Sequence, residues 1–130
     1  MDWLNSNSML VMEKSLDAMW ARQRLISDNI ANNETPGYKA KYLTFEDALR
    51  ERLTGLESRK GASSKEIRRS IQEARPEVFE SPGESMRLDG NNVNVDVEEA
   101  ELVRTAYQYQ FLLRQVTEEL TRLRLAIEGR

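Results

Sequence analysis

The side chains of this chain that could do chemistry are mainly carboxylates, because the sequence contains no cysteine and no histidine. Without cysteine there are no disulfides, thiol nucleophiles or cysteine-bound metals. Without histidine the commonest general base and the commonest transition-metal ligand are missing. Any catalysis would have to use carboxylates, lysine, tyrosine, serine or threonine, and this lowers the expectation that the protein is an enzyme.

The carboxylates gather at Glu98, Glu99 and Glu101, and again at Glu118 and Glu119. Both groups lie in a stretch with helical periodicity, where a run of charges usually forms the solvated face of the helix. We therefore predict that these carboxylates are exposed. The sequence has no glycine-rich phosphate loop, paired acid and base, or nucleophile motif, so we expect no enzyme activity, no catalytic residues and no cofactor.

The segment from Asp89 to Asp96 superficially resembles a calcium loop. A loop of the EF-hand kind places acidic or amide ligands on alternate positions before its glycine and a glutamate at the twelfth position. Here Gly90 comes second, so the match fails and an Asp-Gly turn accounts better for the segment. We expect no metal site.

Composition limits the remaining possibilities. At 130 residues, with 39% apolar and 32% charged residues, the chain is expected to form one domain with a thin core. Its 19 basic and 22 acidic residues are interspersed, which argues against nucleic acid as a partner. No apolar stretch approaches the roughly 18 residues of a membrane span. The first six residues lack the features of a secretory signal, so we expect a chain that is cytosolic or exported by another route.

The C-terminal segment has the strongest periodicity and predicts a helix over 96–128. Asp96 and Glu99 can form a capping box at its start, and Gly129 suits its end. Further apolar residues, such as Val103, Tyr107 and Phe111, widen the stripe and favour a second contact surface over a broad core face. The seam itself follows alternating steps of four and three, as a coiled coil requires, and consists of Leu102, Ala106, Tyr109, Leu113, Val116, Leu120, Leu123 and Ile127.

The N-terminal segment repeats this pattern more weakly and predicts a helix over 8–32. It ends near Asn32 or Asn33, because asparagine tolerates the left-handed cap conformation. Its seam is rich in methionine, whose flexible thioether adapts to irregular surfaces, and has one polar member. The seam consists of Met9, Met12, Leu16, Met19, Gln23, Ile26 and Ile30.

A corner over 33–43 follows this helix. Pro36 and Gly37 fit the central positions of a type II turn, where the second residue needs positive φ. The middle, 44–95, is expected to be partly helical and flexible, with Thr44 as an N-cap and Asp47 at N3. Two short extended pieces are also expected, at Val78-Phe79 and at Val93, Val95 and Val97.

These elements predict a mainly α fold. The two long terminal helices would form an antiparallel helical hairpin or coiled coil, joined through the Pro-Gly corner and the flexible middle, within one domain over 1–130.

Two motifs give the chain a resemblance to a known family. Ser27-Asp28-Asn29-Ile30-Ala31-Asn32, followed after two residues by Thr35-Pro36-Gly37-Tyr38-Lys39, is similar to the N-terminal signature of the bacterial flagellar rod, hook and hook-associated axial proteins. Leu88-Asp89-Gly90-Asn91-Asn92-Val93-Asn94-Val95-Asp96 and Tyr107-Gln108-Tyr109-Gln110 resemble the C-terminal region of the family's proximal rod branch. The short length fits that branch. Asn33, Glu34 and Asn94 depart from the usual pattern.

The resemblance implies a structural, self-assembling subunit of the flagellar basal-body rod, needed for motility. Its terminal helices would form the inner layer of a hollow helical tube, and it would leave the cell through the flagellar type III export apparatus without a cleaved signal. Its partners would be FlgC-like rod subunits and FliE-like proteins near the MS ring. The assembly motif that shapes the shared corner would be Asn29, Asn32, Thr35, Pro36, Gly37 and Tyr38, and the two seams would form the intersubunit core.

Two other interpretations stay open at this point. The chain could be the FlgC-like neighbour in the rod, or a cytosolic coiled-coil adaptor that uses the same stripes. A generic coiled coil has no reason to carry the Pro36-Gly37 corner with its asparagines, which favours the rod.

Overall fold

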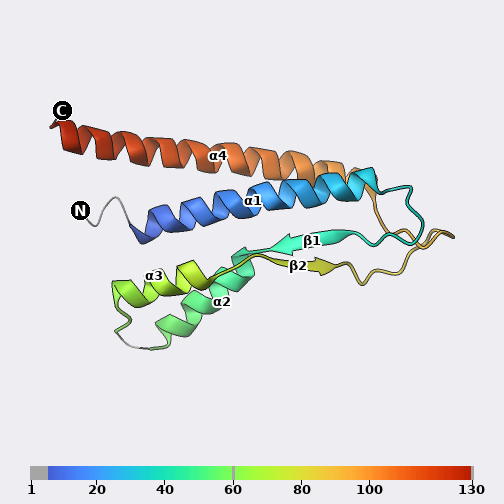
Figure 1. Ribbon diagram of the computed structural model, residues 1–130, viewed down its shortest axis with the longest axis horizontal. Coiled ribbons are helices and arrows are strands. Elements are labelled where there is room, and N and C mark those ends of the chain that lie inside the picture. Colours follow the sequence, from blue (N-terminus) through green and yellow to red (C-terminus); the bar gives the residue numbers. More distant parts are fainter. Residues whose placement is uncertain (1–5, 60, 130) are drawn as a thin grey trace.

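The computed structural model describes residues 6–59 and 61–129 and is mainly helical. The two longest helices, α1 (Asn7–Ala31) and α4 (Val95–Glu128), lie side by side and run in opposite directions (Figure 1). A two-stranded ribbon and two short helices lie on the other side of α1. These elements are β1 (Lys41–Thr44), α2 (Glu46–Glu57), α3 (Ser64–Glu73) and β2 (Glu77–Glu80).

Helix α1 begins and ends through side-chain caps. The Ser6 hydroxyl accepts a hydrogen bond from the Met9 N–H at 3.1 Å, which satisfies one of the free donors of the first turn. The predicted end near Asn32 is confirmed, but the predicted left-handed conformation is wrong, because Asn32 has a φ of −99°. Its backbone N–H and its side-chain amide both donate to the Asp28 carbonyl instead.

Helix α4 begins one residue earlier than predicted. The proposed Asp96 cap is wrong, because the side chain of Asn94 accepts from the Val97 N–H and Asp96 lies inside the first turn. The strand-like interpretation of this segment is also wrong, since Val95 and Val97 are helical. The C-terminal prediction is confirmed: Gly129 has a φ of +67° and its N–H donates to the Leu125 carbonyl.

The middle of the chain holds more regular structure than its sequence pattern indicated. Strands β1 and β2 pair antiparallel, with Lys41 opposite Glu80 and Thr44 opposite Glu77, so the predicted extended piece at Val78-Phe79 is confirmed. The predicted Thr44 cap is wrong. Thr44 ends β1, Phe45 precedes α2 without a side-chain cap, and the Thr44 hydroxyl reaches the Asp47 carboxylate at 3.5 Å.

The hydrophobic core lies where α1, the ribbon and the two short helices meet. It is small, and its alanines allow α1 to approach the other elements closely. Lys14 of α1 strengthens this junction, because its ammonium group donates to the carbonyls of Ile71, Gln72 and Ala74 at 2.8, 2.6 and 2.5 Å. The buried members of the core are Ala18, Leu43, Phe45 and Ala74, with Ala21, Leu25 and Leu49 packed against them.

Within the described residues no helix is both long and apolar enough to cross a membrane.

Candidate assembly site

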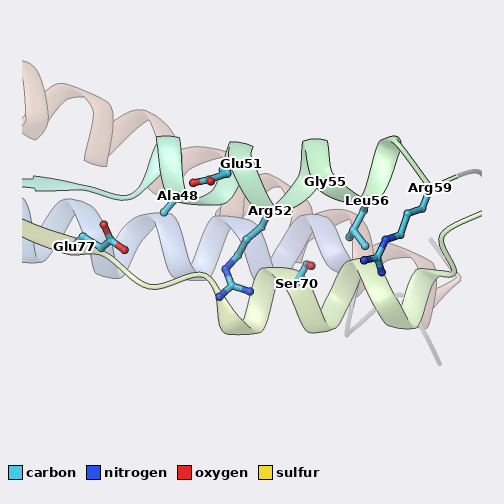
Figure 2. A pocket seen from close by; sticks show the side chains of 8 residues that line it. All are labelled: Ala48, Glu51, Arg52, Gly55, Leu56, Arg59, Ser70 and Glu77. Atoms are coloured by element: carbon cyan, nitrogen blue, oxygen red, sulfur yellow. The ribbon is translucent and has the colours of Figure 1, made fainter.

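A groove between α2 and α3 is a place where a small ligand could be sought. Arg52 and Arg59 extend into it from the side of α2 (Figure 2). Arg52 is already paired with Glu73 at 3.1 Å, and the lining mixes charges of both signs. Nor does any group of three or more acidic side chains in the described part of the chain form a plausible metal site. The groove therefore carries no argument for a cofactor.

The two sequence motifs meet at one end of the molecule. The Gly37 N–H donates to the Asp89 carbonyl at 2.7 Å. Gly37 has a φ of +74°, and the Tyr38 N–H donates to the Thr35 carbonyl at 3.2 Å, which are features of a type II turn. We call residues 35–38 and 87–92 together the clasp, because the turn and the loop hold each other across about fifty residues of sequence.

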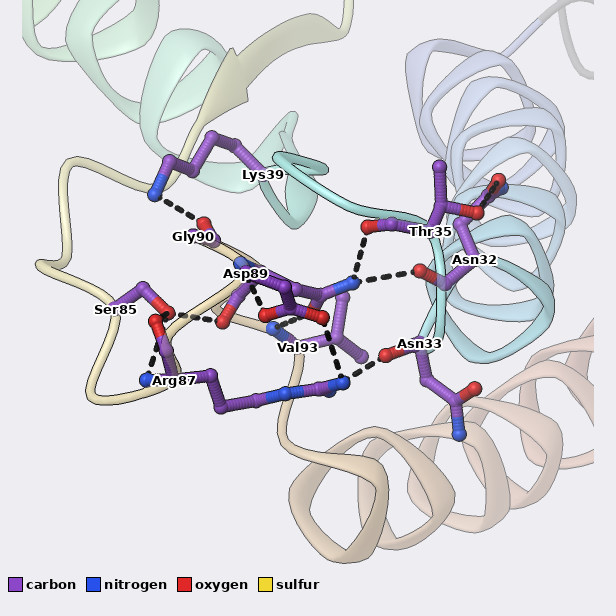
Figure 3. A network of polar contacts seen from close by, with 10 residues as sticks. Asn32, Asn33, Thr35, Lys39, Ser85, Arg87, Asp89, Gly90 and Val93 are labelled. Atoms are coloured by element: carbon purple, nitrogen blue, oxygen red, sulfur yellow. Dashed lines mark hydrogen bonds and ion pairs between the residues drawn. The ribbon is translucent and has the colours of Figure 1, made fainter.

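Asn91 is the centre of the clasp. Its side chain is completely buried, and its amide nitrogen donates to the carbonyls of Asn32 and Thr35 at 2.8 and 2.9 Å. Its amide oxygen accepts from the Val93 N–H at 2.8 Å. Figure 3 shows these bonds joining the end of α1 to the segment before α4. One side chain thus bonds three backbone groups and joins the two segments.

Other residues surround this centre. The Arg87 guanidinium donates to the Asn33 carbonyl at 2.5 Å and pairs with Asp89 at 3.0 Å. The Lys39 ammonium donates to the Gly90 carbonyl at 2.6 Å (Figure 3). The Asn92 side chain accepts from the Ala40 N–H at 2.7 Å. Together these contacts fix the exit of α1 relative to the entry of α4.

A second polar cluster joins α1 to α4 directly. Asn29 is completely buried, and its amide nitrogen donates to the Glu98 carboxylate at 3.1 Å and to the Lys41 carbonyl at 2.8 Å. Its amide oxygen accepts from the Tyr38 hydroxyl at 3.0 Å. The Tyr42 hydroxyl donates to the other Glu98 oxygen at 2.9 Å. The cluster therefore connects α1, β1 and α4.

The prediction that Glu98 is solvent-exposed is wrong, because it is only 1% exposed. Its neighbours Glu99 and Glu101 lie on more open faces of the helix. Glu98 lies on the side of α4 that faces α1, and its first-turn position near the positive helix end favours a carboxylate. The run of acidic residues in the sequence did not indicate which carboxylate would be buried next to hydrogen-bond donors.

The two tyrosines of this cluster are donors and not reactive phenolates. Burial, followed by the hydrogen bond to Glu98, raises the pKa of Tyr42 to about 12. Burial, followed by the negative charge of Asp28, raises the pKa of Tyr38. Both hydroxyls therefore stay protonated at neutral pH and serve the fold as hydrogen-bond donors.

The structure divides the predicted assembly motif into two sets. Asn29 is buried, and Asn32 and Tyr38 are half-buried, with side chains that bond inside the chain. The exposed set is Thr35, Pro36 and Gly37. Sequence reasoning missed two partners of the first set, which are Glu98 for Asn29 and Asn91 for the Asn32 carbonyl.

The solvent exposure of the predicted seam residues differs along the two helices. Near the clasp Ile26 is buried and Leu102 and Ala106 are half-buried. Toward the C-terminus Leu113, Leu120 and Ile127 are 45%, 51% and 64% exposed. The remaining seam residues, all half-buried, are Met9, Met12, Leu16, Met19, Gln23, Ile30, Tyr109, Val116 and Leu123.

Comparison with known proteins gives a consistent result. The chain is 30% identical over 126 residues to the flagellar basal body rod protein FlgB of Bacillus subtilis, covering 97% of each chain. It is 29% identical over 124 residues to FlgB of Aeromonas hydrophila, covering 92% of this chain and 91% of the relative. It is 32% identical over 108 residues to FlgB of Cereibacter sphaeroides, covering 83% and 84%. No protein-family model matches.

Proposed function

This chain belongs to the FlgB family of flagellar basal body rod proteins, and from that premise we propose that it assembles into the rod through its two terminal helices, held in register by the clasp. It is a structural subunit of the flagellar basal body and not an enzyme. The two family motifs meet around the clasp, and the partly exposed seams offer a surface for assembly.

The proposal rests on the exposure of the C-terminal part of the α4 seam. Leu113, Leu120 and Ile127 continue the four-three spacing of a coiled coil, yet each is about half exposed or more. A coiled-coil seam gains its stability from burial against a second helix. We infer that neighbouring subunits supply that helix, so that this part of the seam becomes buried on assembly.

The clasp has a different role in the proposal. At this end of the molecule Asn29 bonds to Glu98 of α4, and the Asn32 carbonyl accepts from Asn91, while the Tyr38 hydroxyl holds the turn against Asn29. The exposed Thr35, Pro36 and Gly37 then form a rigid corner that neighbouring subunits can contact. One part of the family's motif would thus stabilise the fold of the subunit, and the other part would contact neighbouring subunits.

The finer position in the flagellum is also proposed. We place the chain in the proximal rod, outside the cytoplasm, after passage through the type III export apparatus without a cleaved signal. FlgC-like subunits and FliE-like proteins near the MS ring would be its neighbours in a hollow helical tube. The relatives named FlgB, which match most of the chain, favour this position over the FlgC-like one and over a cytosolic adaptor.

The seam is tested by Leu120→Asp in a flagellated strain that lacks its own FlgB. Burying an unpaired carboxylate in an intersubunit seam is costly, so we expect swimming in soft agar to fall to that of the deletion strain and rods to be missing from isolated basal bodies. Thr121→Asp is the matched control, because Thr121 is the exposed neighbour of Leu120 and lies off the seam.

Normal swimming by the Leu120→Asp strain would contradict assembly through the seam. Circular dichroism of the purified variants shows whether either substitution unfolds α4 itself. A loss of swimming with helix content unchanged supports the proposal.

A further inference from the structure

A groove lies at the end of the lobe that α2 and α3 form, beside the loop that joins these two helices. Its volume is about 390 Å³, at the small end of the roughly 300–1,000 Å³ of ligand-binding clefts in proteins. A short apolar segment can therefore fill it. Its apolar lining is half-buried and consists of Leu53, Leu56, Ala62 and Ile67, and Glu57, Arg59 and Gly61 complete the lining.

The start of α1 lies next to this groove, because α1 and α3 run side by side in the same direction (Figure 1). The Asn7 side-chain amide donates to the Ser64 carbonyl at 3.2 Å and lies 3.4 Å from the Ser64 hydroxyl. Further along both helices, and with the same separation of 57 residues in the sequence, the Lys14 ammonium donates to the Ile71 carbonyl at 2.8 Å. The two helices are thus aligned from their first turns, and the chain that precedes α1 enters where α3 begins.

The segment before α1 has the composition to fill an apolar groove. It reads Met1-Asp2-Trp3-Leu4-Asn5 and lies outside the described residues. Trp3 and Leu4 are adjacent large apolar side chains, and an aromatic side chain buries roughly 150–250 Å². Ser6 caps α1 with an extended backbone, at φ −62° and ψ 148°, so the described helix begins only after it.

The distances allow Trp3 to reach the groove. Trp3 is four residues before Asn7, and an extended chain of that length spans about 13 Å. From the contact of Asn7 with Ser64, Ala62 is two residues back along the chain. Ile67 is three residues forward in α3, which is a rise of about 4.5 Å. Both lining residues are therefore within the reach of the segment.

We propose that Trp3 and its neighbour Leu4 dock into this groove of the same chain. The end of α4 also presents apolar side chains, Leu120 and Ile127, but it lies on the opposite side of α1 from the lobe (Figure 1). Another groove, between α1 and α2, is lined from α1 by Ser15, about two turns into the helix. The hydrogen bonds at the start of α1 go to the lobe, and they direct the preceding residues to the same side.

The contact would add an attachment of the lobe to α1. Asn7 and Lys14 hold α3 at its beginning and at its end. The docked segment would hold the loop between α2 and α3, which is the end of the lobe farthest from the ribbon (Figure 1). The N-terminal segment would then help to set the orientation of the lobe. This inference concerns a contact within one chain and does not rest on the proposed function.

Tryptophan fluorescence of the purified full-length chain tests the contact. The sequence has two tryptophans and no cysteine, so Trp20→Phe leaves Trp3 as the only fluorophore of its kind, and one introduced cysteine can carry a nitroxide label that quenches it on contact. Arg59→Cys places the label at the groove. Glu51→Cys, at an exposed position of α2 about 12 Å further back along the helix, is the control. We expect the label at Arg59→Cys to quench Trp3 several times more strongly than the label at Glu51→Cys.

Two outcomes of this measurement would overturn the inference by naming another place for the segment. A label at Arg124→Cys, whose side chain is 76% exposed near the end of α4, would quench Trp3 more strongly than the label at Arg59→Cys if the segment docks on α4. A large excess of unlabelled chain would abolish the quenching if the segment docks on a second copy. Equal quenching at Arg59→Cys and Glu51→Cys would show that the segment does not dock on the lobe at all.

Filling the groove gives a second, independent measurement. Ala62→Glu puts a charged side chain into the groove and leaves the apolar residues of α2 and α3 in place. We expect the Trp3 emission of the Trp20→Phe chain to shift to the red, toward that of the chain unfolded in urea, with the far-UV circular dichroism unchanged. Thr54→Glu, at an exposed position outside the groove, should leave the emission unchanged. An emission that is already as red as in urea before Ala62 is changed would contradict docking.

Discussion

Single amides decide how the two ends of this chain are joined. Asn91 and Asn29 are both completely buried, and each donates to a group in a distant part of the sequence while its oxygen accepts from a nearer backbone N–H. An amide suits this task because it offers two N–H donors and a carbonyl oxygen from one side chain. A carboxylate could not donate, and an apolar residue would leave the facing backbone groups without partners.

The first prediction concerns Asn91. Asn91→Ala leaves the N–H of Val93 without its partner and removes one of the two donors of each of the Asn32 and Thr35 carbonyls, which keep the N–H groups of Thr35 and Tyr38. Each unsatisfied buried group costs about 1–3 kcal/mol, and water can enter part of the space. We therefore expect the free energy of unfolding, measured by urea denaturation, to fall by about 1–3 kcal/mol.

Asn33→Ala is the control for this measurement. Asn33 contributes its backbone carbonyl to Arg87, and its side chain points away from the clasp (Figure 3), so its removal should have little effect. If the two variants were equally stable, the clasp would not depend on Asn91.

At the scale of the element, the sequence predicted those parts that depend on local pattern. The two long helices, the Gly129 cap and the extended Val78-Phe79 all follow from periodicity or backbone preference, and the structure contains them. The cap predicted at Asp96 lies two residues earlier, because the Asn94 side chain takes the free N–H of Val97. The cap predicted at Thr44 lies one residue later, because Thr44 is paired with Glu77 in the ribbon. The burial of Glu98 could not be predicted, since its donors come from residues more than fifty positions away.

The second prediction concerns how the α2–α3 lobe is attached to α1. Lys14 donates to three carbonyls at the end of α3, where a cation also suits the negative end of the helix. Burial, followed by the nearby charge of Arg75, lowers its pKa. Lys14→Met keeps most of the apolar stem but removes these bonds. We expect a loss of about 1.5–3 kcal/mol that is concentrated in α3.

Hydrogen exchange measures this local effect. Amides of α3 should exchange faster in Lys14→Met, while those of α4 keep their protection. Lys65→Met, on an exposed position of α3, serves as the control and should leave exchange unchanged. Uniform acceleration over the whole chain would mean that Lys14 supports the global fold and is not a local attachment.

At the scale of the whole molecule, two bodies are joined by the hydrophobic core and by a small number of polar links. The terminal helices form one body, and the ribbon with α2 and α3 forms the other (Figure 1). Tyr42 links them, because it belongs to β1 and its hydroxyl donates to Glu98 of α4. Its ring also lies 5.9 Å from that of Phe79 in β2. Ionisation of this single phenol should therefore loosen the whole molecule and not only its own strand.

The last prediction is the resulting pH dependence. The pKa of Tyr42 is raised to about 12 in the folded chain, above the value of about 10 in an unfolded chain. The protonated phenol thus favours the fold. Its contribution is fully present below about pH 10 and is lost as pH rises toward 12.

Tyr42→Phe lacks the hydroxyl, so its free energy of unfolding should be lower than that of the wild type at pH 8 and should fall less steeply between pH 10 and 11.5. Tyr107→Phe, at an exposed phenol, should follow the wild-type curve. Parallel curves for the wild type and Tyr42→Phe would show that this phenol does not couple the two bodies.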